Sequence, residues 1–329
     1  MPQTMVDTEV IKKAVELACR APSLHNSQPW RWVAGLANVD LFADPHRIVT
    51  STDNSGREAI ISCGAVLDHF RVAMAAVGWE TDVDQFPNPN NHDHLATIDF
   101  ASADYVAEAR RDRAAAILRR RTDRRPFRAP KDWASFEPVL RSAFDPNLAT
   151  LDVLAEDARP RLVEASRLTE ALRRYDDLYH HELRWWTAPS RDSEGIPETA
   201  LANEAEQREV DLNRRFPADR HSQKSSAGIH DQAEILVLST SGDTREDALN
   251  CGQVLSAVLL ECTVAGLATC TVTHVTELQA SRDVIRELLP GAAAAVPQVL
   301  IRVGTAPAGK GTPEPTPRRP LRDVLELRR

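Results

Sequence analysis

Apolar residues recur every three or four positions in two stretches of the chain, residues 57–78 and 245–266. This spacing predicts a helix over each stretch, and Gly78 stands where a left-handed C-terminal cap would lie. The second stretch is apolar on nearly every face between residues 254 and 260, which is typical of a fully buried helix. Each predicted helix is followed by a predicted strand, at 95–100 and 299–303.

The two stretches also share sequence. Without any gap, Arg57-Glu58 aligns with Arg245-Glu246 and Cys63-Gly64 aligns with Cys251-Gly252, and seven of the 22 aligned positions are identical. Two amphipathic helices could share this composition by coincidence. The shared charged, cysteine and glycine positions favour an internal duplication instead, and a duplicated chain can hold a two-fold interface within itself.

The predicted fold is therefore an α+β fold of two similar halves, residues 1–118 and 119–329. In the first half, a helix is predicted over residues 8–20 with Thr8 as its N-cap. A hairpin with strands at 32–34 and 39–42 is predicted to follow it.

The second half contains two segments without a counterpart in the first. Residues 187–232 are polar and proline-containing, and are interpreted as an insertion. Four prolines within residues 312–321 predict an extended tail, which ends in a short apolar element from Leu321 to Leu327.

Composition narrows the class of protein. The chain has 329 residues, 42% of them hydrophobic, and a net charge of −8, so we expect no nucleic-acid partner. Five cysteines without metal-ligand spacing predict free thiols and no metal site, as in a reducing cytoplasm. Neither a signal peptide nor a membrane span is expected.

A first polar cluster follows the first predicted helix. Residues 21–30 read Ala-Pro-Ser-Leu-His-Asn-Ser-Gln-Pro-Trp and supply a hydroxyl at Ser23, a carboxamide at Asn26 and a backbone stiffened by Pro22. A helix stop followed by a turn would use the same residue types. His25 alone indicates nothing specific.

A second polar cluster holds five arginines within the seven positions 119–125. Guanidinium groups next to the Thr122 hydroxyl suit a phosphate dianion. A solvated basic turn or a weak nucleic-acid patch is the alternative, although the acidic net charge argues against nucleic acid.

At these residues the chain resembles the FMN-dependent nitroreductase family. That family carries an Arg-Arg-Ser/Thr-x-Arg element and a more specific Ala-Pro-Ser-x-x-Asn-x-Gln-Pro-Trp element, and both are present here. The resemblance extends to the Gly266-Leu267 turn and to residues 318–321. It covers most of the chain outside the insertion, and is strongest to the Acg branch of the family.

Family members are normally homodimers whose flavin lies at the subunit interface, between the Arg element of one subunit and the Pro-Ser element of the other. Here the first half keeps only the Pro-Ser element and the second half only the Arg element. The resemblance therefore implies that the two halves mimic the homodimer in one chain, as a monomer with one complete FMN site.

The resemblance also implies which residues hold FMN. Arginines and a threonine would bind the phosphate, the Pro-Ser element would face the pyrimidine edge of the ring, and backbone after the Gly-Leu turn would lie near N5. The resemblance assigns the phosphate to Arg120, Arg121, Thr122, Arg124 and Arg319. It assigns the pyrimidine edge to Pro22, Ser23 and Asn26, and the backbone near N5 to Thr273 and His274. No catalytic side chain is expected, because the flavin itself carries the hydride chemistry.

The implied function is NAD(P)H-dependent reduction of nitroaromatic or quinone-type acceptors. A non-catalytic FMN storage or sequestering protein is the alternative, because the insertion could form a lid. Its apolar residues Leu201, Val210 and Leu212 are too few for a core of their own, so we expect it to lie over the cleft between the halves.

Overall fold

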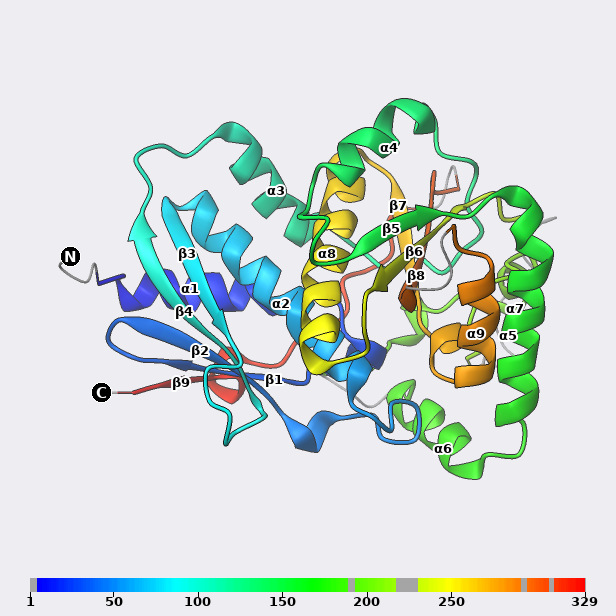
Figure 1. The fold of residues 1–329 in the computed structure, drawn as a ribbon, viewed down its shortest axis with the longest axis horizontal. Coiled ribbons are helices and arrows are strands. Elements are labelled where there is room, and N and C mark those ends of the chain that lie inside the picture. The colour runs from blue at the N-terminus through cyan, green and yellow to red at the C-terminus, as the bar shows by residue number, and fades with distance from the viewer. Residues whose placement is uncertain (1–4, 189–192, 217–229, 291–294, 308–310, 329) are drawn as a thin grey trace.

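The computed structural model describes residues 5–188, 193–216, 230–290, 295–307 and 311–328. Its strands gather into two sheets, with helices between and around them (Figure 1). The helices are α1 (Thr8–Ala18), α2 (Arg57–Ala76), α3 (Glu108–Arg119), α4 (Trp133–Arg141), α5 (Arg159–Arg173), α6 (Asp177–Trp186), α7 (Glu204–Arg208), α8 (Arg245–Val264) and α9 (Gln279–Glu287). The strands are β1 (Trp30–Ala34), β2 (Asn38–Ala43), β3 (Trp79–Gln85), β4 (His94–Ser102), β5 (Thr150–Val153), β6 (Glu234–Thr240), β7 (Ala268–Val272), β8 (Val296–Gly304) and β9 (Leu325–Leu327).

The first sheet has the order β3-β4-β2-β1-β9 and the second the order β5-β6-β8-β7. All neighbouring strands are antiparallel except β1 and β9, where Trp32 pairs with Leu325 in parallel. The last strand of the chain therefore returns to the sheet formed by the first hundred residues. The predicted hairpin is confirmed, because β1 pairs with β2 from Trp30–Ala43 to Ala34–Val39.

The two predicted repeat helices are confirmed as α2 and α8, and they pack against each other between the sheets (Figure 1). Gly64 of α2 and Gly252 of α8 lie opposite each other, although they were paired only by the sequence alignment. A Cβ atom added to Gly64 would stand 2.1 Å from the carbonyl oxygen of Leu249 and 2.8 Å from the Cα of Gly252. Only glycine allows the two backbones to approach this closely.

A single large apolar core runs through this contact. It includes Ile61 and Leu67 of α2 together with Leu249 and Val258 of α8, all of which are buried. The two halves therefore share this core, and a smaller apolar cluster among the described residues lies within the second half.

Several boundaries differ from the predictions. The N-cap of α1 is Asp7, whose side chain accepts a hydrogen bond from the Glu9 amide, and Thr8 is already the first helical residue. Strands β3, β5, β6 and β7 were not predicted. β3 alternates half-buried and exposed positions and carries few apolar residues, so its sequence pattern indicates a strand only weakly.

By length and hydropathy alone, α2 resembles a membrane-spanning helix. However, 78% of its most apolar window is buried inside the protein. Its apolar surface is covered by α8, α1 and the first sheet, which identifies it as a core helix.

Candidate functional site

Two adjoining pockets lie where the segments after α1 and after α3 meet. The deep pocket spans about 780 Å³ and the arginine pocket about 510 Å³, and both volumes include space open to solvent. The two pockets share part of their lining, so they adjoin each other and are together called the cavity. The shared residues are Pro22, Ser23, Thr122, Arg124 and Ile196.

The arginine pocket is named for its cationic side chains. The cations that line it are Arg20, Arg120, Arg121, Arg124 and Arg318, and the one carboxylate along the described part of its lining is Glu314. They come from the end of α1, the segment after α3 and the C-terminal tail. Three chain segments distant in sequence thus bring positive charge to one place.

These charges stand close enough to repel one another. Burial, together with Arg121 and Arg20, lowers the pKa of Arg120 to about 10. Burial and the neighbouring Arg20 and Arg120 also lower the pKa of Arg318 well below its ordinary value. Five guanidinium groups beside a single carboxylate in the described lining, Glu314, are costly in a partly buried site, so the pocket favours an anion.

Three of the five arginines at positions 119–125 line this pocket. Arg119 is exposed at the end of α3, and Arg125 donates two hydrogen bonds to the Asp123 carboxylate, at 2.9 and 2.6 Å. The backbone N–H of Asp123 donates a hydrogen bond of 2.9 Å to the carbonyl oxygen of Thr269, which fixes the segment beside β7. Arg120, Arg121 and Arg124 are the arginines of this cluster that line the cavity.

The segment before β1 adopts a strained turn beside the cavity. His25, Asn26 and Gln28 have φ values of 49°, 59° and 52°, in the left-handed region that favours glycine. The Ser23 hydroxyl accepts a hydrogen bond of 3.0 Å from the Gln28 amide and closes the turn. Such strain concentrates at functional sites, where the surrounding structure must hold it.

Two neutral histidines line the deep pocket. Burial, with Arg214 nearby, lowers the pKa of His274 to about 3. Burial, Arg214 and Arg124 lower the pKa of His25 well below its ordinary value. The His274 Nε2 lies 2.8 Å from the Ser166 hydroxyl, whereas its Nδ1 has no hydrogen-bond partner among the residues that the structure describes.

The insertion reaches the cavity from the opposite side. Ile196, Asn213, Arg214 and Phe216 all line the deep pocket. Arg214 forms an ion pair with Glu277 and donates to the Thr273 hydroxyl at 3.1 Å. The expectation that the insertion has too few apolar residues to fold alone fits this arrangement, because its Val210 and Leu212 are buried against the rest of the protein.

The structure brings nine of the ten predicted site residues to the cavity. Pro22, Ser23, Thr122, Arg124, Thr273 and His274 line the deep pocket, and Asn26, Arg120 and Arg121 line the arginine pocket. The Asn26 amide nitrogen is occupied, because it donates to the carbonyl oxygens of Gly195 and Pro317, both at 3.0 Å.

Arg319, the tenth predicted site residue, lies outside these two pockets. Its guanidinium donates to the carbonyl oxygens of Gln28, Trp30 and Asp323 and lines neither described pocket. Its neighbour Arg318 lines the arginine pocket instead. Adjacent residues of an extended tail point in opposite directions, so the sequence could locate the pair but not choose between them.

Other lining residues were missed altogether. They are His25, Glu58, Ser62, Arg20, Asn213, Arg214 and Phe216. For Glu58 a signal existed in the repeated Arg-Glu pair. No sequence pattern marked Arg20 or the insertion residues as site residues, because only the folded chain brings them to the cavity.

Several buried polar atoms around the cavity lack a hydrogen-bond partner within the described part of the chain. They are His25 Nε2, Glu58 Oε2, Arg120 Nε, Arg121 Nε and His274 Nδ1. Buried polar atoms are normally satisfied, so such a cluster indicates a site for a polar ligand.

A protein-family model and several individual proteins match this chain. The family model described as "Nitroreductase family" matches residues 155–305. The chain is 54% identical to the Mycobacterium tuberculosis protein named "Putative NAD(P)H nitroreductase acg", over 100% of this chain and 98% of that protein.

Two other Mycobacterium tuberculosis proteins are also similar. Rv3127, named as uncharacterized, is 54% identical over 97% of this chain and 93% of its own length, and Rv3131, which shares the nitroreductase name, is 37% identical over 97% and 92%. Among solved structures, one titled "putative nitroreductase" from Anabaena variabilis superposes with a TM-score of 0.49 at 9% identity, over 90% of this chain and 73% of that one.

Proposed function

The chain belongs to the nitroreductase family, and from this premise we propose that it binds one FMN in the joined cavity and uses it to pass electrons from NAD(P)H to a nitroaromatic or quinone-type acceptor. The observation that carries the proposal is the arginine pocket, in which five guanidinium groups face one carboxylate in the described lining, beside a larger pocket lined mostly by uncharged residues.

The arginine pocket fits the phosphate of FMN. We assign Arg120, Arg121 and Arg124 with the Thr122 hydroxyl to the phosphate, and Arg318 takes the place first given to Arg319. A dianion here would relieve the repulsion among the guanidinium groups and would accept hydrogen bonds from the unpartnered Nε–H groups of Arg120 and Arg121.

The deep pocket fits the ring. Pro22 and Ser23 would lie against one part of it, while Thr273 and His274 would lie against another. Asn26 is reassigned to a supporting role, because its amide already joins the turn to the insertion and the tail. When bound, the flavin supplies two-electron hydride chemistry, and the protein orients it and excludes water.

We also propose that the two halves, 1–118 and 119–329, arose by duplication and mimic a family homodimer. The apposition of Gly64 and Gly252 supports this, because equivalent repeat positions meet as they would across a two-fold axis. The strand β9 is then the part of the second half that crosses to the first sheet. On this proposal the chain is a monomer in the cytoplasm with one site.

The absorbance spectrum of the purified protein tests the function. An FMN-like spectrum that bleaches on anaerobic addition of NADPH, and returns when a quinone is added, would support the reductase. A flavin that stays oxidised with NADPH, yet bleaches with dithionite, would support storage instead.

FMN storage remains as a second candidate because the insertion is fastened over the cavity. The Gln28 side chain donates to the Ser193 carbonyl at 2.8 Å, Arg47 forms an ion pair with Glu194, and Arg124 donates to the Ala200 carbonyl at 2.9 Å. These bonds join the insertion to both flavin-binding elements, so they would slow the exchange of ligands.

Phe216 offers a mild test of the lid. Its ring lies edge-on to His25 at 5.9 Å and beneath the Arg124 guanidinium at 5.3 Å. We expect Phe216→Ala to open the deep pocket and to raise the rate of flavin reduction by NADPH in stopped-flow absorbance. Leu201→Ala, in the insertion but outside both pockets, should keep the parent rate. Equal rates in all three proteins would argue against the lid.

A further inference from the structure

The Arg-Glu pair that opens both repeat helices has two different settings. Glu58, at the start of α2, is 3% exposed and lines the deep pocket. Its aligned partner Glu246, at the start of α8, is exposed to solvent. Burying a carboxyl group is costly, so the position of Glu58 at the deep pocket invites a functional explanation.

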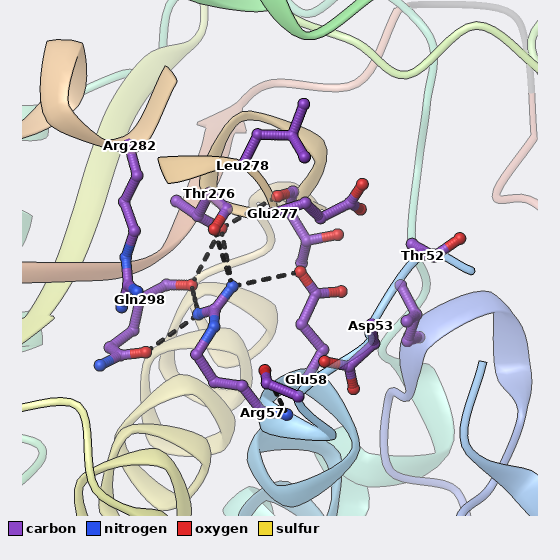
Figure 2. Close-up of polar contacts among 12 residues, drawn as sticks. Thr52, Asp53, Arg57, Glu58, Thr276, Glu277, Leu278, Arg282 and Gln298 are labelled. Atoms are coloured by element: carbon purple, nitrogen blue, oxygen red, sulfur yellow. Dashed lines mark hydrogen bonds and ion pairs between the residues drawn. The ribbon is translucent and has the colours of Figure 1, made fainter. Parts of the chain in front are cut away.

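Figure 2 shows the Glu58 carboxyl group rising from the start of α2 toward the turn at Thr276 and Glu277. Within the described parts of the chain, its Oε1 accepts one hydrogen bond, from Arg57 Nη2 at 3.3 Å, and its Oε2 is buried without a partner. Arg57 directs its shorter bonds elsewhere, to the Gln298 carbonyl at 2.7 Å and the Thr276 carbonyl at 3.0 Å. One long bond does little to stabilise a buried carboxylate.

The charged groups around Glu58 shift its pKa in both directions. Burial, followed by the carboxylate of Glu277, raises the pKa of Glu58 to about 8; Asp53 acts the same way, while Arg57 and Arg214 oppose the shift. Glu277 forms an ion pair with Arg214. With its pKa raised to about 8, Glu58 keeps its proton near neutral pH.

We propose that Glu58 is the proton donor of the deep pocket, presenting its Oε2–H to an oxygen atom of the bound acceptor. This inference rests on the proposed function. A quinone that becomes a hydroquinone gains two electrons and two protons. The hydride, which originates in NAD(P)H and passes through the flavin, carries both electrons and one proton. Glu58 supplies the second proton, and water reprotonates its carboxylate.

The first test asks whether Glu58 is neutral, and it needs neither flavin nor turnover. Glu58→Gln preserves size and removes the acid, and Glu246→Gln is the matched control in the other repeat. Between about pH 7 and about pH 10, infrared difference spectra of the parent should lose a protonated-carboxyl band. That band should be missing in Glu58→Gln and kept in Glu246→Gln. A band that survives in Glu58→Gln would overturn the proposal.

The second test measures proton delivery. Protein loaded with FMN and reduced by dithionite is mixed with benzoquinone, so that NAD(P)H plays no part. We expect Glu58→Gln to re-oxidise about 10²- to 10⁴-fold more slowly than the parent while binding FMN equally well. The parent rate should fall above about pH 8, and the variant rate should not follow that profile.

The outcomes separate the two proposals. Glu246→Gln should match the parent throughout. Equal re-oxidation rates of parent and Glu58→Gln would overturn the proton-donor role even if FMN binds as proposed. If the protein fails to bind FMN, the proposed function fails and the infrared result alone decides the state of Glu58.

Discussion

The double variant Arg120→Ala/Arg121→Ala should lose FMN while its apo form unfolds no more easily than the parent. Each charge-assisted bond to the phosphate contributes roughly 1.5 to 3 kcal/mol, so the pair should weaken FMN binding by about 10²- to 10⁴-fold. In the apo protein the two guanidinium groups repel each other and Arg20, and their removal relieves that repulsion. Fluorescence titration with FMN and urea unfolding of the apo protein measure the two effects.

The matched control is Arg119→Ala/Arg128→Ala. It removes the same charge from exposed positions that line neither described pocket, and it should bind FMN like the parent. If the free energy of unfolding of the apo pocket variant falls as much as its free energy of FMN binding, Arg120 and Arg121 stabilise the fold rather than bind the ligand.

Gly64→Ala should produce a large loss of stability. The new Cβ would stand 2.1 Å from a backbone oxygen of α8, which cannot rotate away as a side chain could. The helices must separate, and we expect a loss of at least about 3 kcal/mol in the free energy of unfolding. Urea unfolding followed by circular dichroism measures it, and expression in an insoluble form would be the extreme result.

Gly311→Ala is the control for this substitution, because no atom lies within 4 Å of the added Cβ. Gly252→Ala should match Gly64→Ala, since its Cβ would stand 2.0 Å from the Ile61 carbonyl oxygen. Since alanine is the better helix former by about 1 kcal/mol, a stable Gly64→Ala would show that α2 and α8 do not pack as described.

The sequence predicted the central architecture because that architecture depends on local patterns. The apolar spacing located α2 and α8, and the aligned Cys-Gly pairs identified Gly64 and Gly252 before any contact was known. The arginine cluster and the Pro-Ser turn were recognisable for the same reason, since each is continuous in the chain.

The remainder of the site depends on contacts that no local pattern encodes. Arg20 faces Arg120 only because the end of α1 lies beside the segment after α3, and Arg214 reaches Thr273 only because the insertion folds back over β7. The choice of Arg318 over Arg319 depends on the twist of a tail held by the Gln28 side chain, which accepts a bond from the Arg319 amide at 2.8 Å. The sequence therefore identified the Arg and Pro-Ser elements of the cavity, and it did not identify lining residues such as Arg20, Arg214 and Arg318.

The central claim is that both halves of the chain together build one flavin site. The direct measurement is the amount of FMN released on denaturation of the fully loaded, purified protein, compared with the protein concentration from amino-acid analysis. One FMN per chain is expected, because the arginine pocket and the strained turn each occur once and meet at a single cavity. Two FMN per chain, or none after saturation with FMN, would contradict the claim.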